Sequence, residues 1–509
     1  MEYKFLSLII LVLAPLIPML LILSPVFPNN TVIIRRFSKW FAGLHFVYSL
    51  CFLLFFNPDL LSMSFPQEIM IFNSSWLKTM GITATFAVDG LSLLLCILTT
   101  FLFLIALIVS KYSITSKHKL YYSLIMLLET SVLGVFCAKD IFLFFLFWQL
   151  QLIPMYFLIL LWGKENAQKA ATKYLVYNCL GSIFLLFSLL VLYYYSFTVS
   201  GVLTANIDSL SFDEYINPIW FQIITFLGFF LAFAPKFPTI PFHRWFVSAQ
   251  KCSLMPVNII IAATSLSMGV YGFIKFNMQI FPTAFKTLSV ILMIVAITNI
   301  ISGAMIGFIK NNIKEIISYT YISMGGFVLF GLSSVTSMGI TGAIFQIFAV
   351  CLIFTGLFLI SGLIFLRTNT CDIEKLGGIA RVMPKLMYFS LPVCLGVIGT
   401  PFLIIFPSII MIILGAFMTE LFDQVTFQLG AIFVIFTLLA ISACVLRLLH
   451  KTFFGNILSE FSRIKDISTS EFIGLLMIVI PVIVFGAAPM ILVNLYSNVV
   501  SIIMDILRI

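Results

Sequence analysis

The sequence predicts an all-α polytopic membrane protein with about 14 transmembrane helices. Composition, the length of the apolar runs and the placement of the basic residues predict this fold class. Of the 509 residues, 62% are hydrophobic and only 9% are charged, and the mean hydropathy is +1.17. Soluble domains carry roughly 25% charged residues. The chain therefore has too few charged groups to cover a water-exposed globule of this size, which excludes the soluble class.

Long apolar windows mark the predicted spans. A helix needs roughly 20 apolar residues to cross about 30 Å of hydrocarbon. The windows are 5–25, 38–57, 86–110, 118–137, 140–162, 172–196, 218–240, 253–276, 286–309, 314–334, 339–367, 388–417, 427–449 and 471–495. The loops between them are too short for a soluble catalytic domain, so we expect one membrane domain.

The basic residues predict how the spans are oriented. The formal net charge is +9, a surplus that favours nucleic acid in a soluble protein and marks the cytoplasmic or matrix face in a membrane protein. Most loop Lys and Arg follow odd-numbered spans, and the loops after even-numbered spans hold only Lys78, Lys139, Lys275 and Lys286. The loop after the sixth span is acidic, with Asp208, Asp213 and Glu214. We therefore expect no nucleic-acid partner, and both termini on the face opposite the basic loops.

Cysteine and histidine lack the spacing of a metal or cofactor site. The nine cysteines form no CxxC pair, and the four histidines lie far apart in the sequence. Zinc, haem and iron–sulfur sites need clustered ligands. We therefore predict buried thiols, no metal, no cofactor and no catalytic residue in this chain.

The segment FLAFAPKFPTIPFHRW (230–245) places Lys236 inside a span that proline must break. The lysine is surrounded by Pro235, Pro238 and Pro241, and each proline removes a backbone donor and blocks a helical carbonyl. From Trp245, a residue expected at the head-group layer, the distance back to Lys236 is about 13 Å of helix, which is near mid-bilayer. Burial favours a neutral amine that can load and unload a proton. Lys236 is therefore a proton-path candidate, and a lysine that extends to the membrane surface is the alternative.

Four other polar residues are candidates for a functional role. Glu129 lies inside the fourth span, either protonated and hydrogen-bonded or part of a proton path. Asp89 begins the third span and is expected to stabilise the helix N-terminus. Gln149 lies near mid-depth and cannot ionise, so a hydrogen bond between helices is its simplest role. His243 follows the broken span, as a group that passes protons or as an interface residue.

Several segments, in this order, resemble subunit 4 of the proton-pumping NADH:quinone oxidoreductases, respiratory complex I. They are FAVDGLSLLL (86–95), GVFCAKDIFLFFLFWQ (134–149), PMYFLILLWG (154–163), AATKYLVY (170–177), AFAPKFPTIPFHRW (232–245), NIKEIISYTYIS (312–323), GLFLISGLIF (356–365) and LLHKTFFG (448–455). The resemblance covers residues 80–455. It implies an antiporter-like membrane-arm subunit with two inverted five-helix repeats, each holding one broken helix, here spans seven and twelve.

The resemblance also implies the division of the chain and its partners. Residues 1–117 would hold helices 1–3, residues 118–276 the first antiporter-like repeat (helices 4–8), residues 277–455 the second (helices 9–13) and residues 456–509 helix 14. The implied partners are other membrane-arm subunits, accessory subunits and phospholipids, with FMN, iron–sulfur clusters, NADH and ubiquinone bound elsewhere in the complex. The 56 phenylalanines are typical of an AT-rich genome, so we predict an organelle-encoded protein of the mitochondrial inner membrane, with its termini toward the intermembrane space.

The chain departs from the family at most of its proton-path positions. A glutamate of the fifth helix, a lysine of the eighth, two histidines and a titratable residue of the second broken helix are replaced, in order, by Gln149, Ser267, Met324, Val350 and Ile409. Lys236 alone remains. Since proton relay needs groups that ionise or hold water, we predict a subunit that couples NADH-to-ubiquinone electron transfer to proton translocation with its own route weakened or lost. A structural scaffold without pumping and a free-standing cation/proton antiporter are the alternatives.

Overall fold

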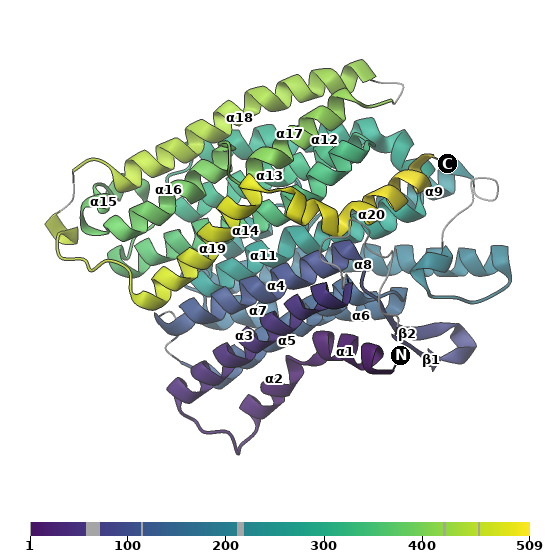
Figure 1. The fold of residues 1–509 in the computed structure, drawn as a ribbon, viewed down its shortest axis with the longest axis horizontal. Helices are drawn as coiled ribbons and strands as arrows, with labels where there is room; N and C mark the ends of the chain where they lie inside the picture. The colour runs from purple at the N-terminus through teal and green to yellow at the C-terminus, as the bar shows by residue number, and fades with distance from the viewer. Residues whose placement is uncertain are drawn as a thin grey trace.

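The computed structural model describes residues 2–56, 72–112, 114, 116–210, 218–420, 424–456 and 459–508, and these are almost entirely helical (Figure 1). The first helices are α1 (Glu2–Leu13), α2 (Leu16–Leu23), α3 (Thr31–Phe56), α4 (Gly90–Val109), α5 (His118–Cys137), α6 (Ile141–Leu150), α7 (Leu152–Trp162) and α8 (Ala167–Ser200). The middle helices are α9 (Ile219–Phe233), α10 (Arg244–Cys252), α11 (Met255–Gly272), α12 (Pro282–Ile309), α13 (Ile313–Ser333) and α14 (Ser337–Thr368). The last are α15 (Ile379–Val382), α16 (Pro384–Ile398), α17 (Ile405–Phe417), α18 (Gln424–Phe453), α19 (Thr469–Ala487) and α20 (Met490–Arg508).

The observed helices follow the predicted spans closely. In the described part of the chain, 12 helical segments are long and apolar enough to cross a membrane. All except α20 coincide with predicted spans. The first and twelfth predicted spans are each divided into two shorter helices, α1 and α2, and α16 and α17. The seventh window, 218–240, holds α9 and the start of a break, and α10 follows beyond the window. The predicted all-α membrane fold, with breaks in spans seven and twelve, is therefore confirmed.

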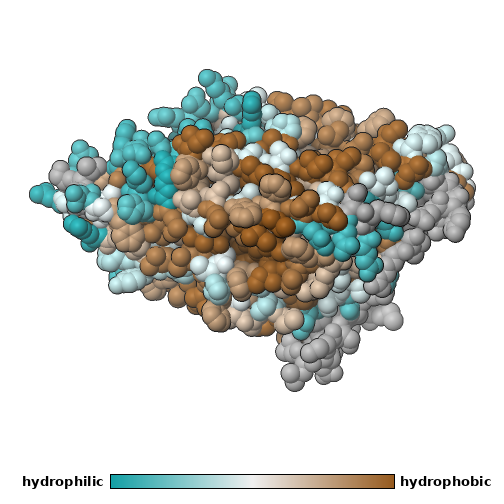
Figure 2. Space-filling model, turned by 90° about the horizontal axis from the view of Figure 1, so that it is seen from above, coloured by the Kyte–Doolittle hydropathy of each residue, from teal (hydrophilic) through white to brown (hydrophobic). Residues whose placement is uncertain are grey.

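The helices lie nearly parallel and form one stack (Figure 1). The stack runs from α1 and α2 at one edge, through α4, α11 and α14, to α18 at the other edge. The apolar windows of α11 and α14 are completely buried, whereas about a third or less of those of α3, α18, α19 and α20 is buried. Figure 2 shows a continuous apolar surface across the middle of the molecule, with hydrophilic residues gathered toward its ends. This arrangement suits helices surrounded by lipid.

A short hairpin lies in the region expected to be an irregular loop. Strands β1 (Phe72–Leu77) and β2 (Ile82–Phe86) pair antiparallel, with Phe72 opposite Phe86. Three β-branched residues in β2 favour an extended backbone. Of the acidic loop residues predicted above, Asp213, Glu214 and the side chain of Asp208 lie outside the described residues.

Two of the four lysines expected in loops lie in helices. Lys275 is buried in a π-helical turn (Phe273–Met278) that follows α11, and Lys286 lies in the second turn of α12. The loop expectation was wrong for both: each lysine lies at the edge of a predicted window, 253–276 or 286–309, where the chain is still helical.

The C-terminal stretch contains two helices where one span was expected. α20 crosses the N-terminal ends of two central helices: the Tyr496 hydroxyl donates to the Thr341 carbonyl of α14 (3.0 Å). Gly90, the first residue of α4, lies so close to α20 that a Cβ there would clash with the Leu495 carbonyl. Both termini lie on the right-hand side of the view in Figure 1, the side on which the β1–β2 hairpin is also found.

Candidate functional site

The break between α9 and α10 is a ten-residue turn segment, 234–243, held by side chains of its neighbours. The Trp245 indole donates to the Pro235 carbonyl (2.8 Å), and the Ile240 amide donates to the Asn299 side chain of α12 (2.7 Å). These bonds replace helical hydrogen bonds that the prolines prevent. Trp245 is completely buried, so its expected place at the head-group layer was wrong: the indole instead satisfies the broken backbone.

Lys236 lies in this break and is 2% exposed. Its Nζ donates to Gln151 Oε1 at 2.5 Å and lies 5.6 Å from the centre of the Tyr174 ring. Within the described residues, no carboxylate forms an ion pair with it. The strongest partner of this buried amine is therefore a neutral amide, which accepts a hydrogen bond but cannot accept a proton from it.

The amide beside the lysine is Gln151, which the sequence analysis missed, and not Gln149. Gln149 is half-buried, and its Oε1 has no hydrogen-bond partner among the described residues. Gln151 lies between α6 and α7, where Pro154 cannot donate to the Leu150 carbonyl. A signal was present in the sequence, since Gln151 is a second amide at mid-depth, three residues before Pro154.

A row of polar side chains on α8 borders the break. Tyr174, Asn178 and Ser182 follow at four-residue spacing and so share one helix face. The Tyr174 hydroxyl, Asn178 Oδ1 and Ser182 Oγ are buried without a protein partner in the described residues. Gly181 on the same face lies against the Ala232 carbonyl of α9. Buried groups of this kind can hold water.

Glu129 has a buried basic partner, His45, that was not predicted from the sequence. His45 of α3 bonds it through Nδ1 (2.8 Å to Oε1), and His45 Nε2 bonds the Leu11 carbonyl (3.0 Å). All three groups are buried, and Glu129 Oε2 has no partner among the described residues. Since Nε2 must carry a hydrogen to bond a carbonyl, the Nδ1–Oε1 contact holds one proton, on either atom.

The remaining candidates are buried at separate places in the described part of the chain. His243, directly before α10, is buried, and its Nδ1 has no partner in the described chain. The Ser267 hydroxyl donates to the Ala263 carbonyl of its own helix (2.7 Å). The side chains at the other family positions are buried and apolar: Met324, Val350 and Ile409. The structure therefore does not bring these residues together with Lys236 through any bond among the described residues.

The second break, 399–404, has a polar pair that the sequence analysis did not predict. Ser408 of α17 donates to Gln346 Oε1 of α14, and Gln346 Nε2 lies 3.6 Å from the Met324 sulfur. Gly399 has φ +82°, a conformation that glycine adopts without strain at a helix C-terminus. Neither partner of this pair ionises.

Asp89 has the predicted helix-capping contact and an additional charged partner. Its Oδ1 accepts from the Ser92 amide of α4 (2.7 Å), and its Oδ2 accepts from Lys275 (2.5 Å). Both residues are buried. The pair joins the start of α4 to the π-helical turn after α11 and compensates two charges that would be costly to bury alone.

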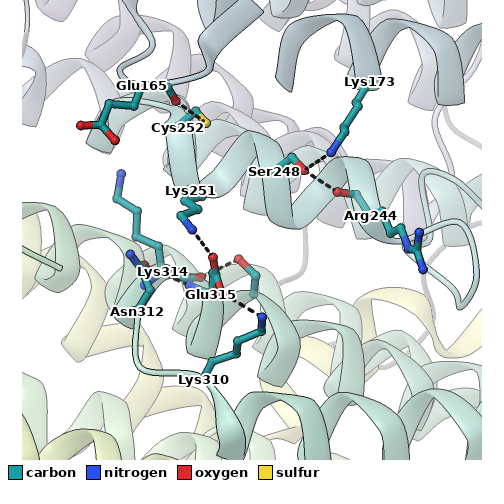
Figure 3. A network of polar contacts seen from close by, with 11 residues as sticks. Glu165, Lys173, Arg244, Ser248, Lys251, Cys252, Lys310, Asn312, Lys314 and Glu315 are labelled. Atoms are coloured by element: carbon teal, nitrogen blue, oxygen red, sulfur yellow. Dashed lines mark hydrogen bonds and ion pairs between the residues drawn. The ribbon is translucent and has the colours of Figure 1, made fainter. Parts of the chain in front are cut away.

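The basic face contains a network between α10 and α13 (Figure 3). Lys251, in the last turn of α10, bonds Glu315, and Lys310 approaches the same carboxylate from the other side (3.4 Å). Asn312 caps α13 by accepting from the Lys314 amide (3.0 Å). Lys314 itself is buried and donates to the Ser253 carbonyl (2.7 Å).

The described residues contain no group of three or more His, Cys, Asp or Glu side chains that could hold a metal ion. The ionisable groups of the interior described above occur as pairs, His45–Glu129 and Asp89–Lys275, or singly, as Lys236 does.

Comparison with known proteins identifies the family. The family model "NADH:quinone oxidoreductase/Mrp antiporter, TM" matches residues 138–437, more than half of the chain. NAD(P)H-quinone oxidoreductase chain 4 2 of Thermosynechococcus vestitus is 31% identical over 501 residues, covering 98% of this chain and 91% of that protein. Chain 4 1 of Picosynechococcus sp. is 33% identical over 388 residues, covering 75% of this chain and 71% of that protein.

Solved structures share the fold. A chain of respiratory complex I from Thermus thermophilus with bound NADH superimposes with a TM-score of 0.85 at 24% identity, covering 98% of this chain and 99% of that one. A chain of the Mrp complex from Dietzia sp. gives 0.87 at 17% identity, covering 99% and 98%. The chain therefore belongs to the NADH:quinone oxidoreductase chain 4/Mrp antiporter family of membrane subunits.

Proposed function

We propose that the chain is a core membrane-arm subunit of a complex I-type NADH:quinone oxidoreductase and that its own proton route is weakened or lost. Family membership supports the first part. One observation carries the second: Lys236 hydrogen-bonds the neutral Gln151 and has no carboxylate partner among the described residues. A buried amine without a counter-charge is costly to protonate.

Onward transfer from Lys236 would also be impaired. The next positions of the family's path hold Ser267, whose hydroxyl bonds its own helix, and buried Met324, Val350 and Ile409. A thioether and two aliphatic side chains neither ionise at membrane depth nor order water. The proposed contribution to coupling is therefore conformational, with proton-holding groups at His45–Glu129 and Lys236 and with His243 as a further candidate.

The test is the number of protons translocated per electron pair by the whole complex in proteoliposomes. Lys236→Met is expected to leave this ratio unchanged, because the lysine is not part of a continuous route. Gln149→Glu and Gln151→Glu are also expected to leave it unchanged, because the downstream groups are missing. A lower ratio in Lys236→Met at normal electron-transfer rate, or a higher ratio in either glutamate variant, overturns the weakened route.

A free-standing cation/proton antiporter is the second candidate, favoured by the fold shared with the Mrp complex. Affinity purification from native membranes separates the two functions. The proposed subunit is expected to copurify with flavin and iron–sulfur polypeptides. Recovery as a single carrier that exchanges protons for cations in vesicles would instead establish the antiporter.

The proposed location is an energy-transducing membrane, with the mitochondrial inner membrane as the specific prediction. That specific prediction rests on the phenylalanine-rich composition, whereas the relatives named above are cyanobacterial and do not support it. Immunodetection in purified mitochondrial inner membranes is the expected result, and detection only in another membrane contradicts it.

A further inference from the structure

A cavity on the basic face has no part in the proposed proton route. It lies between the α7–α8 loop, α10, the start of α13 and the loop after α14, with a volume of about 670 Å³. Two acidic residues, Glu165 and Asp372, contribute to its wall. Its basic lining residues are Lys164, Lys169, Lys173, Lys251, Lys314 and Lys375. The wall is therefore strongly cationic.

Most of these ammonium groups have no carboxylate partner. Lys251 pairs with Glu315, Lys314 donates to a backbone carbonyl, and Lys173 approaches the Ser248 hydroxyl (3.4 Å). Among the described residues, no carboxylate forms an ion pair with the lysines of this wall other than Lys251. Positive charge in a concave site, left uncompensated by the protein, attracts an anion.

A second cavity of about 350 Å³, with a wall of mixed polarity, adjoins the cationic one. The two share Lys164, Lys314 and Phe365 in their walls. The Phe365 ring marks the border, with the Lys164 ammonium 3.6 Å and the Lys314 ammonium 5.8 Å from its centre. One part of the second cavity's lining is apolar and forms its apolar wall, and Ser116 and Ser253 contribute polar surface beside it; the apolar wall consists of Leu161, Trp162, Leu254, Met255 and Leu366. The cationic chamber thus adjoins a cavity of mixed polarity that includes an apolar wall.

We propose that the two cavities together bind one anionic phospholipid. The phosphate head group would contact the lysines, and the glycerol and first acyl carbons would contact the apolar wall. Basic pockets between transmembrane helices on the cytoplasmic or matrix side suit such head groups, and ammonium–phosphate contacts are charge-assisted hydrogen bonds. A free phosphate would use only the cationic chamber. The inference does not depend on the proposed proton route.

The test titrates the purified, delipidated complex with dioleoyl-phosphatidylglycerol and counts bound lipid by native mass spectrometry. The Lys164→Ala/Lys169→Ala variant removes two cavity lysines, and its affinity for the added lipid is expected to fall about 30-fold. The matched control, Lys385→Ala/Lys465→Ala, removes two exposed lysines outside both cavities and is expected to stay within about twofold. Unchanged affinity in the cavity variant overturns the proposal.

Two further binding measurements distinguish an anionic lipid from a free phosphate. Phosphatidylcholine is expected to bind more weakly than phosphatidylglycerol, and inorganic phosphate is not expected to displace the lipid. Equal binding of both lipids, or displacement by phosphate at matching concentration, contradicts an anionic lipid site.

A measurement on the unmodified chain covers the case in which the cavity variant fails to assemble. Cys371 lines the cationic cavity and is partly exposed. Phosphatidylglycerol is expected to slow its alkylation by N-ethylmaleimide, while the partly exposed Cys51 of α3 keeps its rate. Equal rates at Cys371 with and without the lipid overturn the proposal.

Discussion

Ionisable residues inside the spans differ in the partner that each one has. Asp89 bonds Lys275, and Glu129 bonds His45, so these carboxylates have basic partners. Lys236 instead hydrogen-bonds the neutral side-chain amide of Gln151. Because an isolated buried charge costs several kcal/mol, the first two pairs can contribute to stability in this fold, whereas Lys236 favours its neutral state. That difference leads to separate expectations for substitution.

Loss of the Glu129 side chain should destabilise the protein more than its conversion to an amide. Glu129→Ala leaves the buried His45 Nδ1 without a partner, at a cost of about 1–3 kcal/mol. Glu129→Gln can still donate a hydrogen bond to that nitrogen and should cost less. The measurement is the thermal unfolding midpoint of the purified complex. Equal midpoints for the two variants would show that the His45 contact contributes nothing.

Lys164 gives the proposed lipid site a pH dependence. Burial lowers the pKa of Lys164. Its positive charge is present below that lowered pKa and is lost as the pH rises through it, before ordinary lysines deprotonate. Phosphatidylglycerol binding should therefore weaken at the onset of the alkaline range.

The pH titration has its own control. Lys164→Ala is expected to remove one alkaline step in lipid binding, whereas Lys385→Ala should retain it. A binding curve of Lys164→Ala that keeps the same step would assign the titration to another group of the cavity, such as Lys314 or Cys371.

At the scale of elements, the break between α9 and α10 was predictable but its supports were not. Proline acts on its own backbone and on the carbonyl four residues earlier, so the break can be recognised locally. The contacts that hold it come from distant helices: Asn299 on α12, Gln151 beside α7 and Gly269 on α11. Contacts between residues that lie far apart in a single sequence leave no local pattern from which they could be predicted.

The choice between Gln149 and Gln151 shows the same limit. Residues two positions apart on a helix lie about 200° apart around its axis, so only one of the two glutamines can face the lysine. The family alignment selected Gln149. The helix is interrupted at Gln151, where α6 ends and α7 begins, and this interruption decides which glutamine faces Lys236. The orientation of the chain after the interruption cannot be calculated from the residue spacing alone.

Gly269 should be intolerant of even one added carbon. A Cβ there would lie 2.7 Å from the Phe237 backbone nitrogen, in the break that holds Lys236. Gly269→Ala is expected to cost about 1–3 kcal/mol through overpacking. Gly325→Ala in α13 is the matched control, because its Cβ would meet only the Leu266 side chain, at 3.6 Å. Comparable losses of thermal stability in both variants would contradict the close approach.

At the scale of the whole molecule, apolar windows and basic loops predicted the helical stack, whereas the hairpin and α20 were not predicted. The window 471–495 is continuously apolar, so it was assigned to a single span. Pro489 interrupts it, α19 ends at Ala487, and α20 begins at Met490. An apolar window shows how apolar and how long a segment is, but not how its helices are oriented. The orientation of α20 depends on its contacts with Gly90 and Thr341.

Those contacts fix a topology that labelling can test. α14 has 32 residues, about 48 Å at 1.5 Å per residue, which exceeds the hydrocarbon thickness of about 30 Å. Tyr496 of α20 bonds Thr341 at the start of α14, while Cys371 follows its end. The two residues must therefore lie on opposite faces of the membrane.

A membrane-impermeant maleimide is accordingly expected to label Cys371 only from the face that carries the basic loops. A protease-cleavable tag after Arg508 should be removed only from the other face. Cys351, buried within α14, serves as the control that stays unlabelled from both sides. Labelling of Cys371 and removal of the tag from the same face would break the alternation of basic loops, and with it the assignment of the cationic cavity to the cytoplasmic or matrix side.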